Sequence, residues 1–238
     1  MKKAAFYTLG CKVNQYETEA MAELFADSGY EIKEFTEVAD VYVINTCSVT
    51  NMGDRKSRQI IRRAKKLNPN AVIAVTGCYA QTAPDEVLAI EGVNLVLGTK
   101  DRKNIVTLVE ELNTESNINH VSDIMSNHEF EELQIKQYSN RTRAFIKIQE
   151  GCNQFCSYCI IPYARGPVRS RAKDDVVREI KELAHNGFKE IILVGIHVAS
   201  YGVDLGDTTL ESLIMDVDKI DGVEKMKSAE FPGTYHAT

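Results

Sequence analysis

The sequence predicts an α/β protein, an N-terminal doubly wound parallel sheet domain followed by an incomplete (β/α) barrel. Short apolar runs alternate with helical patterns at intervals of roughly 30 residues, as parallel sheets with right-handed crossovers require. A polar stretch over 113–140, acidic in its middle, interrupts this alternation. We therefore expect a first domain over 1–112, a linker over 113–140 and a second domain over 141–238.

The first domain is predicted to contain four strand–helix units. Each strand is an apolar run, and the runs lie at 4–8, 41–45, 71–76 and 93–97. Helical periodicity marks 16–27, 54–67 and 101–112, and a short helix opens at Pro84. Gly29 is placed to end the first helix.

Cysteines follow three of these strands. Cys11, Cys47 and Cys78 each lie two or three residues beyond a different strand. Parallel strands bring their carboxyl ends to one edge, where ligands gather, so we expect a metal cluster held by these three thiols. A buried, unligated cysteine is the alternative at any single position. The fourth strand ends in Gly98 and Thr99, which leaves one ligand position open.

The helix over 54–67 is strongly basic. Seven lysines and arginines stand against one acid, in a chain of net charge -6. Two interpretations of this helix stay open: its basic face contacts RNA phosphates, or it is only solvated.

The second domain begins with an alternating strand over 144–149 that leads into the loop GCNQFCSYCIIPYARG at 151–166. Cys152, Cys156 and Cys159 can hold three corners of a four-iron cluster and leave one iron free for a small molecule. A zinc knuckle or buried unligated cysteines are the alternatives. Tyr158 is placed to cover one face of such a cluster.

Further along, we expect helices over 174–185 and 210–220 and strands over 190–194 and 223–229. Gly195 follows the first of these strands and would let a ligand approach the backbone closely. His197 is a candidate metal ligand or acid/base, or a hydrogen-bonded structural residue. A further strand is possible at 133–135. So few strands cannot close a barrel, and the ending FPGTYHAT shows no helix or strand pattern.

Composition narrows the class of protein. With 44% hydrophobic and 26% charged residues, the chain is typical of a soluble globular protein. Apolar runs stay well short of the ~20 residues of a membrane span, and no signal-peptide pattern opens the sequence, so a cytoplasmic location is expected. Six cysteines in such a protein indicate metal binding rather than disulfides.

Four motifs together resemble one family. TLGCKVNQYETE, INTCSVT, VTGCYAQ and GCNQFCSYCIIPYARG are similar to segments of the radical-SAM tRNA methylthiotransferases. GCKVNQYE and GIHVASYG resemble the branch that modifies N6-threonylcarbamoyladenosine, rather than the branches that act on isopentenyladenosine or on a ribosomal-protein aspartate. The second domain would then be an incomplete radical-SAM barrel.

The resemblance implies two 4Fe-4S clusters and S-adenosyl-L-methionine (SAM) as cofactors. Cys152, Cys156 and Cys159 would hold the cluster that binds SAM, and Cys11, Cys47 and Cys78 the auxiliary cluster. The family implies cleavage of SAM to a 5'-deoxyadenosyl radical, which takes hydrogen from C2 of the modified adenosine. Sulfur reaches C2 through the auxiliary cluster, and a second SAM supplies the methyl group. Tyr158 and Gly195 are the expected cofactor contacts, and no residue is singled out as catalytic.

The implied partners are the tRNA anticodon loop and an electron donor such as flavodoxin or ferredoxin. The sulfur donor is left open, and no membrane partner is expected. Six basic residues near the cysteine loop, against Glu150 alone, predict a second basic patch that binds phosphate, holds the SAM carboxylate or is solvated; they are Arg141, Arg143, Lys147, Arg165, Arg169 and Arg171. Because family members continue to an RNA-binding domain, we expect a C-terminally truncated form, and an inactive cluster-binding fragment is an alternative.

Overall fold

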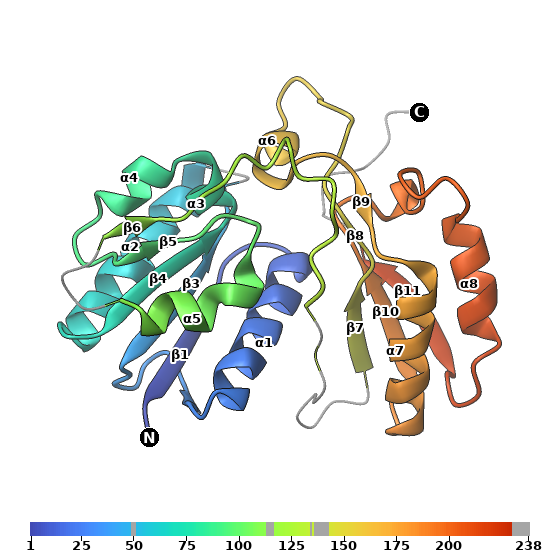
Figure 1. Cartoon of the computed structure of the whole chain (residues 1–238), viewed down its shortest axis with the longest axis horizontal. Coiled ribbons are helices and arrows are strands. Elements are labelled where there is room, and N and C mark those ends of the chain that lie inside the picture. Colours follow the sequence, from blue (N-terminus) through green and yellow to red (C-terminus); the bar gives the residue numbers. More distant parts are fainter. Residues whose placement is uncertain (49–50, 113–116, 134, 136–142, 230–238) are drawn as a thin grey trace.

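The structure, a computed structural model, describes residues 1–48, 51–112, 117–133, 135 and 143–229. Its strands form a six-stranded, a three-stranded and a two-stranded sheet, accompanied by helices (Figure 1). The α/β class expected from the alternating pattern is confirmed. Arg141 and the closing FPGTYHAT lie outside the described residues.

The first domain is one parallel sheet with the strand order β2-β1-β3-β4-β5-β6. Its strands are β1 (Lys3–Thr8), β2 (Glu31–Lys33), β3 (Val41–Thr46), β4 (Val72–Gly77), β5 (Leu95–Val96) and β6 (Ile118–Asn119). Its helices are α1 (Lys12–Asp27), α2 (Asn51–Leu67), α3 (Cys78–Thr82), α4 (Pro84–Leu88), η1 (Arg102–Asn104) and α5 (Ile105–Glu110).

Helices cover both faces of this sheet, which explains why its central strands read as continuous apolar runs. Val41 and Val43 of β3 point to the face covered by α1 and α5. Tyr42 and Ile44, the alternate residues of the same strand, pack beneath α2, α3 and α4 (Figure 1). All six residues of β3 are buried.

The second domain contains a parallel sheet with the order β11-β10-β7 and a small antiparallel pair, β8-β9. Its strands are β7 (Arg143–Lys147), β8 (Gln149–Glu150), β9 (Arg169–Ser170), β10 (Glu190–Val194) and β11 (Lys225–Ala229). Its helices are α6 (Ile161–Arg165), α7 (Lys173–His185), η2 (Val198–Ser200) and α8 (Leu210–Asp218). Within the described ranges this sheet forms no closed barrel, as expected from the few strands.

Some predicted elements differ from the structure. The predicted strand over 144–149 divides, because β7 pairs with β10 while Gln149 and Glu150 pair with β9. Leu133 and Ile135 belong to no strand; instead, their side chains are buried in the core of the second domain. β6 lies in the predicted linker and extends the first sheet through β5.

Helix α1 joins the two domains. Met21 and Phe25 lie in the core of the first domain, whereas Tyr16 and Ala20 lie in the core that α7 and α8 form on the second sheet. The Tyr16 hydroxyl also donates a hydrogen bond to the Leu133 carbonyl. One helix therefore fixes how the edge of the first sheet meets the second domain.

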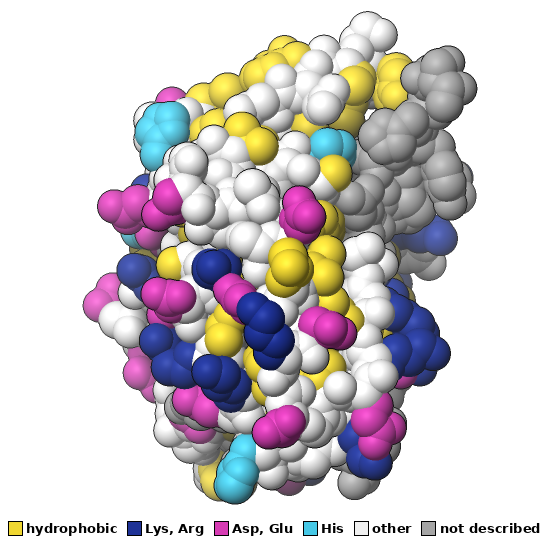
Figure 2. Space-filling model, turned by 90° about the vertical axis from the view of Figure 1, so that its right-hand side faces the viewer, with side chains coloured by type: hydrophobic (Ala, Val, Ile, Leu, Met, Phe, Trp, Pro, Cys, Tyr) yellow, Lys and Arg dark blue, Asp and Glu magenta, His cyan; other side chains and the backbone are white. Residues whose placement is uncertain are grey.

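The surface of the second domain carries charges of both signs. Figure 2 shows basic and acidic side chains interspersed over the face that carries α8, with hydrophobic side chains between them. Ile214 and Met215 of α8 are among the exposed hydrophobic residues. In the part of the chain that is described, no helix has both the length and the apolar character to cross a membrane.

Candidate functional site

The first cysteine triad lies at the carboxyl ends of three adjacent strands. Cys11 precedes α1 directly after β1, Cys47 follows β3, and Cys78 is the first residue of α3 after β4. A Cβ atom added at Gly10 would lie 3.1 Å from the Cys47 sulfur, so the Cys11 loop runs directly past Cys47. Cys78 is also near enough to Cys11 to raise the pKa of its thiol.

The side chain of Asn14 ties these strand ends together. Its Nδ2 donates to the Leu9 carbonyl at 2.8 Å and to the Thr46 carbonyl at 3.0 Å. Gly77 adopts φ +96°, and a Cβ there would lie 2.4 Å from the Thr46 carbonyl oxygen. The close approach of the β3 and β4 ends therefore requires glycine immediately before Cys78.

The second triad lies on the loop between β8 and α6. Cys152 is buried, Cys159 is half-buried and Cys156 is exposed. Backbone hydrogen bonds shape the loop, from Cys152 N–H to Gly166 O at 3.0 Å and from Cys159 N–H to Cys156 O at 2.9 Å. Burial raises the pKa of the Cys152 thiol, and Cys159 and Cys156 nearby raise it further.

Cys11 of the first triad meets two cysteines of the second triad at one small apolar cluster. Val13, Cys152, Ile161 and Ile196 form its buried centre, and Cys11 and Cys159 pack against it. One cysteine of the first domain and two of the second thus share a single patch of side chains. The structure brings together cysteines that are far apart in the sequence.

The donor sets of both triads consist of thiols. Among the described residues, no three His, Cys, Asp or Glu side chains converge closely enough to hold one metal ion. Each triad offers thiols alone, the ligands that iron–sulfur clusters require, and a four-iron core spans more space than one ion. The residues present therefore suit two clusters with three protein ligands each.

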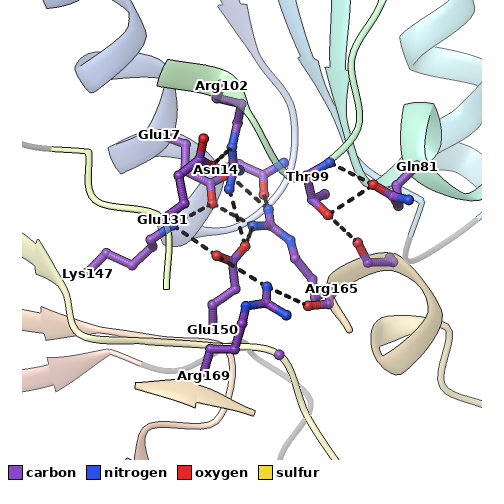
Figure 3. Close-up of polar contacts among 12 residues, drawn as sticks. Asn14, Glu17, Gln81, Thr99, Arg102, Glu131, Lys147, Glu150, Arg165 and Arg169 are labelled. Atoms are coloured by element: carbon purple, nitrogen blue, oxygen red, sulfur yellow. Dashed lines mark hydrogen bonds and ion pairs between the residues drawn. The ribbon is translucent and has the colours of Figure 1, made fainter. Parts of the chain in front are cut away.

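A buried ionic network lies beside the cysteines, and sequence reasoning missed it. Figure 3 shows Arg102, Lys147, Arg165 and Arg169 gathered around Glu17, Glu131 and Glu150. Glu17 is 0% exposed, as are Arg102 and Arg165. A carboxylate on the otherwise buried face of α1 was the available signal, because such a group needs a cation as partner.

The network holds both carboxylates in their charged form. Burial alone would raise the pKa of Glu17, but Arg102, Arg165 and Lys147 outweigh it and lower this pKa to about 2. In the same way burial opposes ionisation of Glu150, and Lys147, Arg102 and Arg165 hold its pKa well below the ordinary value. The pairs of Glu17 with Lys147 and Arg165 cross between the two domains and stabilise their interface.

The network also corrects the prediction of a second basic patch. Lys147, Arg165, Arg169 and Arg171 are buried and face carboxylates of the protein, so they are not solvated and do not form a phosphate-binding surface. Arg143 is exposed and pairs with Glu190 at 2.8 Å. The count against Glu150 alone missed carboxylates outside the segment around the cysteine loop, such as Glu17, 148 positions from Arg165, and Glu179, eight positions from Arg171.

Three other predicted site residues are placed by the structure. Tyr158 is 85% exposed on the cysteine loop. A Cβ at Gly195 would lie 3.0 Å from Gln149 Oε1, so packing against Gln149 accounts for this glycine, and its contact with a cofactor stays a prediction. His197 is 8% exposed. Its backbone N–H donates a hydrogen bond to Gln149 Oε1, and its ring Nδ1 is hydrogen-bonded to Ser200 Oγ, so the structure agrees with the hydrogen-bonded structural residue of the two alternatives.

The basic helix α2 keeps most of its charge at the surface. Arg55, Lys56, Arg62 and Arg63 are exposed. Arg58 instead stacks over the Tyr79 ring, with its guanidinium 5.8 Å from the ring centroid. This helix therefore remains available for a polyanionic partner.

Comparison with known proteins identifies both domains. Residues 3–98 match the model of the uncharacterized protein family UPF0004, and residues 146–233 match the Radical SAM superfamily. Among solved structures, the radical S-adenosylmethionine methyltransferase TsrM from Kitasatospora setae shares the fold. Its TM-score is 0.58 at 14% identity, over 91% of this chain and 51% of that chain.

Curated relatives extend across nearly the whole chain. The threonylcarbamoyladenosine tRNA methylthiotransferase MtaB of Bacillus subtilis is 51% identical over 95% of this chain and 51% of its own length. That of Aquifex aeolicus is 43% identical over 94% of this chain and 55% of its own. The tRNA-2-methylthio-N(6)-dimethylallyladenosine synthase of a Sulfurihydrogenibium species is 36% identical over 92% and 52%.

The chain thus spans about half the length of the curated relatives it matches. The residues matched by the two family models contain the two cysteine triads, Cys11, Cys47 and Cys78 in the first and Cys152, Cys156 and Cys159 in the second. On its two domain matches and on these relatives, the chain carries a UPF0004 segment and a Radical SAM segment and is similar, along nearly its whole length, to about half of each tRNA methylthiotransferase it matches.

Proposed function

We propose that this chain carries out the cluster chemistry of a methylthiotransferase that modifies C2 of N6-threonylcarbamoyladenosine next to the anticodon of tRNA. The observation that supports this most is the meeting of Cys11 of the first triad with Cys152 and Cys159 of the second, at the apolar cluster that also contains Val13, Ile161 and Ile196. Domains over 1–112 and 141–238, joined by a linker over 113–140, would each supply one triad. Methylthiolation needs a radical source and a sulfur source within reach of one base.

The residues of the chain have separate roles in this proposal. Cys152, Cys156 and Cys159 hold the cluster that binds SAM, and Cys11, Cys47 and Cys78 hold the auxiliary cluster. When bound, the first cluster supplies the electron that cleaves SAM, and the auxiliary cluster conveys sulfur.

Other side chains of the protein have supporting roles around the two cluster sites. Val13, Ile161 and Ile196 keep water out of the space between the triads. Tyr158, exposed on the loop, is placed to cover the bound cofactor, and Gly195 is the proposed backbone contact. The buried ion pairs of Glu17 and Glu150 hold the two domains in register.

The exposed basic face of α2 is the proposed contact with the tRNA backbone. A flipped or unstacked adenosine in the anticodon loop is the kind of RNA target that proteins read readily. A flavodoxin or ferredoxin would supply electrons in the cytoplasm. The threonylcarbamoyl branch is favoured because relatives named for that substrate match this chain at 51% and 43% identity.

The test is anaerobic reconstitution with iron, sulfide, SAM and a reductant, in the presence of isolated tRNA. We expect 5'-deoxyadenosine to form and 2-methylthio groups to appear on threonylcarbamoyladenosine, measured by mass spectrometry of digested nucleosides. Cys156→Ala should abolish both products. Iron-loaded protein that forms no 5'-deoxyadenosine, or that modifies isopentenyladenosine instead, would refute the proposal.

A further inference from the structure

Arg165 reaches from the second domain to the cysteine triad of the first. It is the last residue of α6, on the segment that follows the cysteine loop, and its side chain is fully buried. Its Nη1 lies 2.5 Å from Glu17 Oε1 and 2.6 Å from Glu150 Oε1. Its Nη2 donates to Asn14 Oδ1 at 2.5 Å (Figure 3).

Asn14 connects this guanidinium to the cysteines. The same Oδ1 atom that accepts from Arg165 lies 3.6 Å from the Cys11 sulfur. The Nδ2 of that amide holds the carbonyls of Leu9 and Thr46, next to Cys11 and Cys47. Arg165 therefore holds the side-chain amide of Asn14, which in turn hydrogen-bonds the backbone next to Cys11 and Cys47.

The charge of Arg165 lies close to the first triad. One atom, Asn14 Oδ1, is 2.5 Å from Arg165 Nη2 and 3.6 Å from the Cys11 sulfur. Electrostatic effects over such distances are large in a buried, low-dielectric interface.

The network is not electrically neutral, and the buried Nε–H groups of two of its arginines, Arg165 and Arg169, are left over among the described residues. Four cations, Arg102, Lys147, Arg165 and Arg169, face three carboxylates, Glu17, Glu131 and Glu150. The buried Nε–H of Arg165 has no hydrogen-bond partner among the described residues. An unpaired buried donor is costly, so a bound group that accepts from it is favoured.

We propose that Arg165 is a positioning residue that sets the reduction potential of the auxiliary cluster held by Cys11, Cys47 and Cys78. This rests on the proposed function, because it requires a cluster at that triad. Its positive charge stabilises the more negative, reduced state of a thiolate-ligated cluster, since nearby charge is one of the factors that set such potentials. The second domain thereby tunes a centre held by the first.

The experiment isolates the auxiliary cluster in the full chain. Cys152, Cys156 and Cys159 are replaced by Ala, the protein is reconstituted anaerobically, and the midpoint potential is measured by an EPR-monitored redox titration. In this background Arg165→Gln removes the positive charge and the paired Nη1 and Nη2 donors of the guanidinium. Lys147→Gln is the matched control, because Lys147 is buried in the same network and contacts Glu17 and Glu150.

We expect R165Q to shift the midpoint to a more negative potential, on the order of tenfold in the one-electron equilibrium or about 59 mV. R165K should stay near the parent value, and K147Q should shift it less than R165Q. E17Q removes a counter-charge of Arg165 and should shift the midpoint in the positive direction. This opposite sign would not follow from a loosened interface.

Each other result overturns the inference. A potential in R165Q that equals the parent value, that moves no further than in K147Q, or that R165K reproduces contradicts a role for the charge. If R165Q does not retain iron, E17Q decides, and an unchanged or more negative potential in E17Q contradicts the inference. Absence of iron from the parent background would instead refute the proposed function, so the two failures are distinguishable.

Discussion

Glu17 shows how one residue can decide the arrangement of two domains. It lies on α1 of the first domain, yet its carboxylate pairs with Lys147 and Arg165 of the second. Removing one member of a buried ion pair leaves the other charge without compensation, which is far more costly than losing a surface pair. The interface therefore depends on the charged form of this side chain.

Stability should follow the ionisation of Glu17. Its pKa is about 2 in the folded protein against an ordinary value of 4.5. A lowered pKa contributes stability that is complete above the unfolded value and is lost as the pH falls through the folded value. The free energy of unfolding, measured with urea, should therefore decline as the pH is lowered from 4.5 to 2.

Glu17→Gln should cost about 3 to 5 kcal/mol of unfolding free energy near neutral pH. It should also flatten this acid dependence, because the substituted side chain no longer titrates. Glu150 remains in the variant as a control, and its own contribution should persist. A variant with the same pH slope as the parent protein would show that Glu17 does not supply it.

Gly151 is the residue-scale test of the cysteine loop. It adopts φ +75°, and a Cβ there would lie 1.8 Å from the Pro167 carbonyl oxygen. Gly151→Ala should cost about 1 to 3 kcal/mol or more and lower the iron bound at the loop, because Cys152 must shift. Unfolding curves and iron content measure the two effects.

Gly187 provides the matched control for that substitution. It has a similar φ of +89°, but nothing lies within 4 Å of an added Cβ. Gly187→Ala should therefore show backbone strain alone, with iron binding unchanged. Equal iron loss in both variants would contradict a steric role for Gly151.

At the scale of elements, helix α2 carries the proposed tRNA contact. Replacing the exposed Arg62 and Arg63 with Gln should weaken tRNA binding several-fold and reduce the salt dependence of the affinity. The control replaces Arg178 and Lys181, exposed on α7, with Gln. Filter binding at several salt concentrations compares the pairs, and an equal loss in both would argue against a specific role for α2.

Element prediction succeeded where the local pattern was strong. β3, β4 and β10 are largely buried apolar runs, β1 is an apolar run buried at Ala4 and Ala5, and the longer helices that follow them carry clear periodicity. β2 and β6 were missed because they are two or three residues long and partly exposed, so no alternation marks them. α6 is one turn within the loop, too short for helical periodicity to appear.

The candidate site, too, could be predicted from the sequence only in part. Cysteine positions relative to strand ends, and the spacing within the loop, were visible in the sequence and were enough to expect two triads. The network around Glu17 was not, because Glu17 and Arg165 are 148 positions apart and nothing in either local sequence names its partner. Charges counted along the chain therefore suggested a basic surface where the folded protein has buried cations paired with carboxylates.

At the scale of the whole molecule, two domains with unrelated sheets present their cysteines to one another. Helix α1 packs into both cores, and the ionic network fills the interface beside the triads. The first domain alone would keep Arg102 but lose Lys147 and Arg165 as partners of Glu17. The second alone would keep Glu150 but lose Glu17 and Asn14 as partners of Arg165. Each domain therefore completes the surroundings of the other's cluster site.

The iron content of anaerobically reconstituted protein tests the central claim most directly. The parent chain should hold about eight irons, and replacement of Cys11, Cys47 and Cys78 by Ala, or of Cys152, Cys156 and Cys159 by Ala, should each leave about four. A chain that binds about one zinc instead, or that keeps its full iron content after either replacement, would contradict the assignment of two clusters to these two triads.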